Sequence, residues 1–394
     1  MTVVIQNTTS PSSTGIFVPV AGLTVFAIAA GYLMSLVPLS LSSFRIDSQY
    51  AGWLASSYYI GLLIGSMMIE PIISKMGHRA AFVSFLLLLA STVIVLPLFA
   101  NRDAWLLARL IAGMAVAGIF VVVESWLLIS DCPKQRAKRL GIYMTSLYGG
   151  TTVGQLGVGV IGVDGFGPFI AVLALLLTAT LPAIMLRQSP PKQQAHLSLS
   201  LKDIARLNKP AIIGCVVSGI VMGTIYGLMP LSLRQSQLDP NQISVLMAAI
   251  VLGGMTIQPI IGKLSVVISK TLLLALVSLL GVFAVGLTYL TNDFHVLAMA
   301  LALLGMSAFA LYPVAITLAC EKLDAAYIVA ATQVMLFSYS VGSALGPIGA
   351  GSFLEQPLAN PSNGLMDYFF IVLLATSIYM LLASAKRSDT ALAS

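Results

Sequence analysis

Residues 109–124 read Arg-Leu-Ile-Ala-Gly-Met-Ala-Val-Ala-Gly-Ile-Phe-Val-Val-Val-Glu, an apolar segment with a charge at each end. With its apolar flanks, the segment is long enough to cross a bilayer as a helix. Helical spacings of three and four place Arg109, Gly113 and Glu124 on one face. The two charges are about 22 Å apart along a helix, so each needs its own partner. Because an ionisable group in lipid costs roughly 2.5–3.5 kcal/mol, both are candidates for function.

The composition of the whole chain also indicates a membrane protein. Its 394 residues are 58% hydrophobic and 9% charged, and the mean hydropathy is +0.97. Soluble domains carry about 25% charged residues, so we expect an all-α polytopic membrane protein. Three widely spaced cysteines suggest neither a disulfide framework nor a metal site. We find no nucleophile–base pair and no phosphate-binding loop, so we expect no enzyme, cofactor, metal or nucleic-acid partner.

Apolar runs of about 18–25 residues predict transmembrane helices. We expect twelve, at residues 17–41, 50–73, 80–100, 104–130, 140–163, 168–186, 211–233, 242–263, 271–291, 294–320, 327–353 and 366–385. They divide the chain into an N-terminal six-helix bundle (1–186), a cytoplasmic linker (187–210) and a C-terminal six-helix bundle (211–394).

The basic residues orient this topology. With both termini in the cytoplasm, sixteen of the twenty lysines and arginines fall in cytoplasmic segments. Arg45, Arg102 and Arg234 fall outside, and Arg109 lies within the membrane. This excess follows the positive-inside rule and accounts for the net charge of +6 without a nucleic-acid partner. We therefore expect a multi-pass monomer in a bacterial cytoplasmic (inner) membrane.

The two halves repeat short motifs at a common offset. Val-Pro-Leu-Ser-Leu at 37–41 returns as Met-Pro-Leu-Ser-Leu at 229–233, and Gly113-Met114 returns as Gly305-Met306. Both offsets are 192 residues, which indicates two six-helix pseudo-repeats. Repeated halves that rock about a site near the membrane midplane are a transporter architecture.

The chain resembles the major facilitator superfamily (MFS) over nearly its full length. Ser74-Lys75-Met76-Gly77-His78-Arg79 is similar to the gate loop of that superfamily, although the usual Asp is missing. Arg109-x-x-x-Gly113 is similar to its helix-4 motif, which implies an Arg linked with proton coupling. Stretches such as Val121–Ser125, Ser218–Leu231 and Ser338–Pro347 resemble the YcaD-type branch. The resemblance implies the fold and generic transport, and no substrate.

The gate and cytoplasmic-loop candidates are Glu70, Lys75, Gly77, Arg79 and Glu321.

Glu124 and Arg109 are the candidates for proton coupling. A carboxylate in a low-dielectric site can become a reversible proton carrier, but Glu124 could instead pair with the basic residues at 134–139 or cap a helix. Arg109 could bind a substrate anion or bias the protonation of a nearby carboxylate. A structural pairing with polar groups on the helices at 17–41 or 140–163 is the alternative.

Buried phenols and amides in lipid need partners, so those at mid-depth should face the interior. The substrate-cavity candidates are Tyr32, Tyr58, Tyr59, Tyr148, Gln155, Tyr226, Gln258, Tyr312, Gln333 and Tyr339. Simple hydrogen bonds between helices remain the alternative for each.

These features predict a secondary active transporter of a small solute that works by alternating access. We expect it to be proton-coupled, with efflux slightly favoured because of one dominant membrane carboxylate and an aromatic-rich interior. The alternatives are a proton symporter that imports a small metabolite, with Arg109 holding its anionic group, and a non-transporting membrane scaffold or receptor.

Overall fold

The computed structural model describes residues 17–128, 133–185, 208–290, 293–321, 325–355 and 364–392, and all regular elements in these ranges are helices. The linker expected at 187–210 lies outside them except for its last three residues. The described α-helices are α1 (Phe17–Ser40), α2 (Ala51–Leu98), α3 (Arg102–Leu128), α4 (Pro133–Ile161), α5 (Gly167–Met185), α7 (Lys209–Gln235), α8 (Pro240–Val267), α9 (Lys270–Leu290), α10 (Phe294–Cys320), α11 (Ala325–Glu355) and α12 (Gly364–Leu392). Two short 3-10 helices, Ser42–Phe44 and Ser48–Tyr50, connect α1 to α2.

The expected membrane helices are present. Within the described residues, eleven helical segments are long and apolar enough to span a membrane. Two of them, Ser48–Ile69 and Pro71–Leu98, belong to α2, which contains a backbone break at Gly77. Gly77 has φ 77° and ψ 156°, a conformation that side chains with a Cβ rarely adopt. The predicted loop is thus a single sharp turn between two spans.

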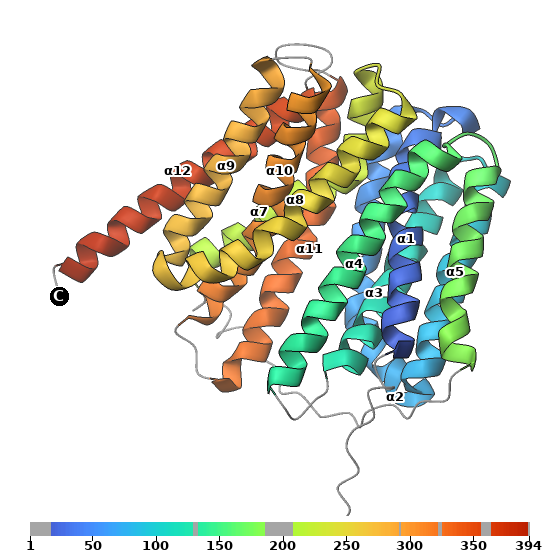
Figure 1. Cartoon of the computed structure of the whole chain (residues 1–394), viewed down its shortest axis with the longest axis horizontal. Helices are drawn as coiled ribbons and strands as arrows, with labels where there is room; N and C mark the ends of the chain where they lie inside the picture. Colours follow the sequence, from blue (N-terminus) through green and yellow to red (C-terminus); the bar gives the residue numbers. More distant parts are fainter. Residues whose placement is uncertain are drawn as a thin grey trace, which may run out of the picture.

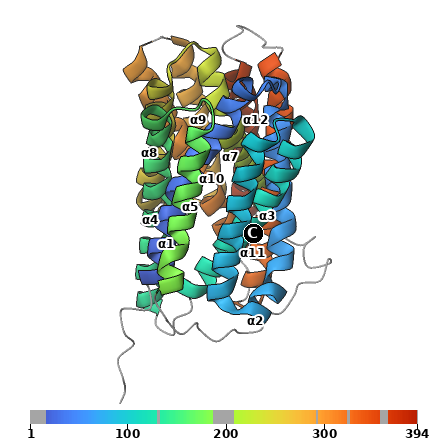
Figure 2. The same cartoon turned by 90° about the vertical axis from the view of Figure 1, so that its right-hand side faces the viewer.

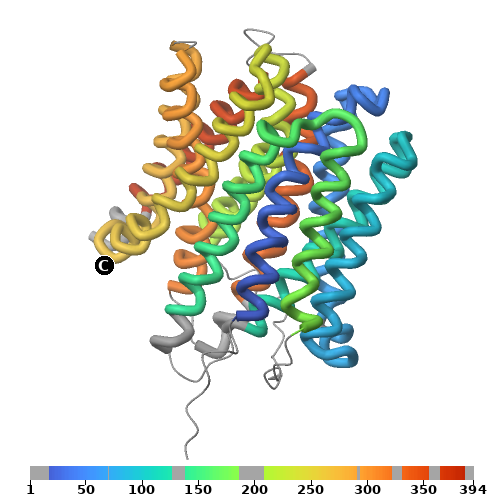
Figure 3. The backbone as a smooth tube through the Cα atoms, turned by 45° about the vertical axis from the view of Figure 1, so that its right-hand side comes forward, coloured from blue at the N-terminus to red at the C-terminus, as the bar shows by residue number. Residues whose placement is uncertain are grey.

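The twelfth expected span is α4, which is too polar to qualify by composition. Its apolar residues are interrupted by Gly, Thr, Tyr and Gln. It contacts α1 on one side and α8 on the other, as Figure 3 shows along the middle of the molecule. Because neighbouring helices rather than lipid cover much of α4, it tolerates these polar side chains.

The helices form two groups, an N-terminal half (α1–α5) and a C-terminal half (α7–α12), which lie side by side (Figure 1). The helix axes of both halves are roughly aligned with one another (Figure 2). Contacts repeat between the halves: α1 packs on α4 as α7 packs on α11, and α2 packs on α3 as α8 packs on α10. The common contact pattern agrees with an internal duplication.

Close contacts at glycine recur at equivalent positions of the two halves. At many glycines, a Cβ in place of the hydrogen would collide with the carbonyl oxygen of a neighbouring helix, so only glycine allows the backbones to approach so closely, and four of these contacts illustrate the repeat. These contacts are Gly113 with Tyr58, Gly305 with Ile250, Gly154 with Ile28, and Gly346 with Ile220. Both partners of the first contact recur 192 residues later in the second, and likewise for the third and fourth. The offset found in the sequence is therefore a packing repeat.

One end of the bundle is closed by contacts between the halves. All six residues of Ser35–Ser40 in α1 and of Leu228–Leu233 in α7 are buried, so no face of either helix end is open. The Arg234 guanidinium donates a hydrogen bond to the Leu39 carbonyl across the boundary. We call this the sealed end. The opposite end, where α3 and α5 finish and α4 and α7 begin, is the linker end.

Further contacts brace the sealed end. A Cβ at Gly52 of α2 would lie 2.6 Å from the Pro347 carbonyl of α11. In the same way, a Cβ at Gly159 of α4 would lie 3.1 Å from the Asn241 Cα of α8. The duplicated Pro-Leu-Ser-Leu motifs therefore lie at the end where three helix pairs, α1–α7, α2–α11 and α4–α8, bring the halves together.

Candidate functional site

Arg109 lies between the halves, directly beneath the sealed end. It is the eighth residue of α3, about 10 Å from the start of that helix at 1.5 Å per residue. Its side chain is 7% exposed. The guanidinium carbon lies 4.3 Å from the centre of the Tyr58 ring, a cation–π contact. Its Nε has no hydrogen-bond partner among the described residues. In the described residues, Arg109 thus stacks on a ring of α2, and the alternative of a hydrogen-bonded pairing with the helices at 17–41 or 140–163 is not observed there.

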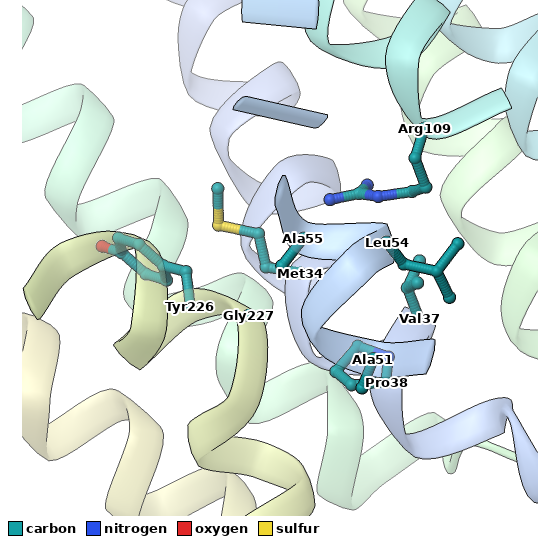
Figure 4. A pocket seen from close by; sticks show the side chains of 9 residues that line it. All are labelled: Met34, Val37, Pro38, Ala51, Leu54, Ala55, Arg109, Tyr226 and Gly227. Carbon is teal, nitrogen blue, oxygen red and sulfur yellow. The ribbon is translucent and has the colours of Figure 1, made fainter. Parts of the chain in front are cut away.

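A small cavity of about 10 Å³ remains at this point, room for about one water molecule. Figure 4 shows Arg109 reaching from α3 toward Met34, with Tyr226 and Gly227 of α7 on the opposite wall. The remaining lining residues are Val37, Pro38, Ala51, Leu54 and Ala55. Because both halves supply its walls, any rocking of one half against the other changes the volume around Arg109.

Tyrosines from both halves extend from Arg109 into the interior. The rings of Tyr58 and Tyr59 are 5.3 Å apart, and those of Tyr312 and Tyr339 are 5.1 Å apart, both edge to face. Phe309 of α10 contacts Tyr148 of α4 at 5.3 Å and Tyr226 of α7 at 6.4 Å. Edge-to-face pairs at these distances add about 0.5–1.5 kcal/mol each. We call Tyr58, Tyr59, Tyr148, Tyr226, Phe309, Tyr312 and Tyr339 the aromatic cluster; six of its members were expected from the sequence.

Glu124 lies near the other end of α3, toward the linker end. Its carboxylate accepts a hydrogen bond from the Tyr143 hydroxyl of α4 at 2.8 Å. The residue is exposed, yet it is closely surrounded by protein and within electrostatic reach of Tyr312 in the other half. Such a position is typical of a cavity wall. Among the side chains that the structure describes, which leave out those of residues 133–137, no Lys or Arg forms an ion pair with it, and the alternative pairing with Lys134 or Arg136 lies outside that set.

Four other cavity candidates mostly serve packing. The Tyr32 hydroxyl donates to the Gly162 carbonyl at 2.6 Å, and Gln155 accepts from Ser35 at 2.5 Å. The Gln258 amide donates to the Phe309 carbonyl at 3.2 Å and so supports the cluster from α8. Gln333 is exposed in α11. The bonds of Tyr32, Gln155 and Gln258 connect different parts of the bundle, as the alternative interpretation allowed.

The gate candidates occupy the linker end. Arg79 donates through its guanidinium to the carbonyls of Ala183 and Ile184, at the end of α5. Lys75 is exposed, and the side chain of Glu70 lies outside what the structure describes. Glu321, at the end of α10, forms an ion pair with Lys270 at 2.7 Å. The linker end is thus held within each half by cation–carbonyl and ion-pair contacts.

Arg109 and Glu124 have no charged counterpart at the equivalent positions of the C-terminal half. The position equivalent to Arg109, 192 residues later, is the buried Leu301, and that equivalent to Glu124 is Ile316. A residue needed only to hold the shared architecture would be expected in both halves. Their restriction to one half separates Arg109 and Glu124 from the common scaffold.

Sequence reasoning overlooked three residues. Phe309 joins the aromatic cluster, Tyr143 is the partner of Glu124, and Arg234 connects the halves. Arg234 alone had a sequence signal, because it directly follows the second Pro-Leu-Ser-Leu motif. Phe309 and Tyr143 depend on helix rotation, which the apolar pattern does not specify.

This fold of two repeated helical halves around a charged, aromatic interior is that of a membrane transporter. The family model of the Major Facilitator Superfamily matches residues 20–347, and the chain belongs to this family.

Among similar proteins, an uncharacterized MFS-type transporter YcaD from Escherichia fergusonii is 32% identical over 377 residues, covering 95% of this chain and 96% of the relative. The YcaD protein of Salmonella enteritidis is 33% identical over 371 residues, covering 94% and 95%. Among solved structures, the nucleoside transporter NupG matches with a TM-score of 0.76 at 15% identity, covering 95% of this chain and 99% of that one. The chain is therefore a multi-pass membrane transporter of the MFS fold and not an enzyme.

Proposed function

We propose that this chain is a proton-coupled secondary transporter that moves a small solute by alternating access of its two halves. The observation that carries the proposal is Glu124. This carboxylate is exposed near the linker end and accepts a hydrogen bond from one neutral hydroxyl, and no ion pair joins it to any Lys or Arg whose side chain the structure describes, a set without residues 133–137. A carboxylate without a fixed counterion can gain and lose a proton as its surroundings change between states.

The positions of Arg109 and Glu124 suggest a division of roles. Arg109 lies beneath the sealed end and Glu124 near the linker end of the same helix. The sequence places the linker end in the cytoplasm, so the present arrangement is closed to the outside. Opening the sealed end would require the Arg234 bond to Leu39 to break and the packed ends of α1 and α7 to separate. The transporter would be a monomer in a bacterial inner membrane with both termini cytoplasmic.

Glu124→Gln tests the coupling. A thermal-shift screen against metabolites and drugs first identifies a stabilising solute. In proteoliposomes, wild-type protein should accumulate this solute under an imposed pH gradient and should exchange it without one. Glu124→Gln should keep exchange and lose gradient-driven accumulation, because the amide cannot carry a proton. Asp103→Asn is the matched control, since Asp103 is exposed at the start of the same helix.

Two outcomes would contradict the proposal. Full accumulation by Glu124→Gln would remove the proton role, and an absence of solute exchange by wild-type protein would favour a scaffold or receptor.

Direction is tested with the same solute. Efflux is slightly favoured because the interior carries one dominant carboxylate and many aromatic rings. Antiport predicts accumulation in inverted vesicles with an acidic lumen. Import by symport predicts accumulation in right-side-out vesicles when the outside is acidic. The guanidinium of Arg109, whose Nε has no hydrogen-bond partner among the described residues and which could hold an anionic group, is the observation that keeps import as the second candidate.

A further inference from the structure

We propose that the transported solute is a ring-bearing organic anion, with its carboxylate bound by Arg109 and its ring held by the aromatic cluster. This inference rests on the proposed transport function and adds the chemical class of the solute.

The first argument is the unbalanced charge of Arg109. The side chain is 7% exposed, and no carboxylate in the described ranges is within ion-pair distance of it. Asp103, the nearest acid along α3 in sequence, is bound to Arg102 at 2.7 Å. Glu124 is fifteen residues away, about 22 Å along the helix. A buried cation is costly unless it is paired, and the Tyr58 ring compensates only in part. An anion from outside the chain would complete the pair.

The second argument is an excess of hydrogen-bond donors. Arg109 offers only donors, and its Nε is unpaired. Within the described part of the chain, the hydroxyls of Tyr58, Tyr59, Tyr148 and Tyr226 make no hydrogen bond. A carboxylate has two acceptor oxygens and matches this group of donors. A cationic solute would instead meet Arg109 with no carboxylate beside it.

The third argument is the shape of the surrounding surface. The Phe309 ring of the C-terminal half lies 5.3 Å, centre to centre, from the Tyr148 ring of the N-terminal half and 6.4 Å from the Tyr226 ring of its own half. The Phe309–Tyr148 pair crosses the boundary between the halves in the present arrangement. Separation of the halves would expose their faces together with the Arg109 guanidinium. A planar ring that enters there would restore the edge-to-face and stacked contacts that the separation breaks.

The experiment compares probes that share a ring and differ in charge. Benzoate, phenylacetate, 2-naphthoate and indole-3-acetate are each tested beside the corresponding carboxamide and amine. The full-length protein is held in detergent at pH 7.5, where the carboxylates are ionised and the amines are charged. The unfolding midpoint is measured at increasing probe concentration, because a ligand that binds only the folded state raises it.

Carboxylate probes should raise the midpoint of the wild-type protein, and the matched amides and amines should not. Arg109→Gln should weaken the carboxylate effect by about tenfold or more, the usual consequence of losing a charged hydrogen bond. Arg109→Lys should retain part of it, because lysine keeps the charge and loses the planar fork. Arg102→Gln, at an exposed position of the same helix, should bind like wild type.

The results separate the solute class from the transport function. Stabilisation by amines or amides, or by none of the probes, overturns the proposed solute class. If amines stabilise the protein and a pH gradient drives their accumulation through Glu124, the transport function stands and the solute class is wrong. If carboxylates bind through Arg109 but no gradient drives them, the anion site stands and proton coupling is wrong.

Discussion

At the scale of single residues, this chain uses its few membrane charges in different ways. Arg79 has a structural role: its guanidinium donates hydrogen bonds to the last carbonyls of α5, where a helix end favours a cation. Arg109 has no such acceptor and stacks on a ring instead. The gate-loop motif predicted the position of Arg79 but not its partner, because α5 follows it by about a hundred residues.

Arg79→Ala should lower the stability of the folded protein by about 1–3 kcal/mol, since it leaves two helix-end carbonyls without their charged donor. Thermal unfolding in detergent measures the loss. Lys75→Ala, at an exposed position four residues earlier, should leave the midpoint unchanged. Equal effects of the two substitutions would show that the contact with α5 contributes nothing specific.

At the scale of elements, close packing of small residues decides which helices pair. Without a hydrophobic driving force between helices in lipid, backbone contact at glycine becomes a main source of association. The contacts of Gly154 with Ile28 and of Gly346 with Ile220 show this for α1–α4 and α7–α11. Small residues on α4 and α11 are visible in the sequence. Their pairing with α1 and α7 of their own halves is not.

Gly154→Ala should push α4 away from α1 and destabilise the protein by about 1–3 kcal/mol, because its Cβ would collide with the Ile28 carbonyl. Gly346→Ala should behave alike in the second half. Gly149→Ala in α4 is the matched control, since no neighbour lies within 4 Å of a Cβ there. Size-exclusion profiles and unfolding midpoints compare the three. A stable Gly154→Ala protein would refute the close contact.

At the scale of the whole molecule, the two halves meet firmly at the sealed end. Buried ends of α1 and α7, the bond from Arg234 to Leu39, and the pairing of Gly159 with Asn241 all lie there. Alternating access requires these contacts to separate in each transport cycle. A covalent bond across them should therefore stop transport without unfolding either half.

A disulfide between Gly159→Cys and Asn241→Cys tests this, in a background in which the three native cysteines are serine. A Cβ at Gly159 would lie 3.1 Å from the Asn241 Cα, so the two backbones approach closely enough for a disulfide, whose Cα atoms are usually about 4.4–6.8 Å apart. Oxidation should abolish solute exchange, and reduction should restore it. Each single-cysteine variant should be insensitive to oxidation. Undiminished exchange by the cross-linked protein would show that the sealed end does not open.

The number of helices, the repeat and the two unusual charges followed from the chain alone, because hydropathy, motif offset and the cost of charge in lipid are local properties. The sequence also predicted the span at 140–163 that α4 forms, although α4 is more polar than the other spans. The tertiary structure decided which face each helix turns to which neighbour. It placed Tyr58 under Arg109, brought Tyr143 to Glu124, and separated Tyr32 and Gln155, which join helices, from the aromatic cluster between the halves. Helix rotation and contacts across the repeat depend on packing between residues far apart in sequence, so only the folded molecule reveals them.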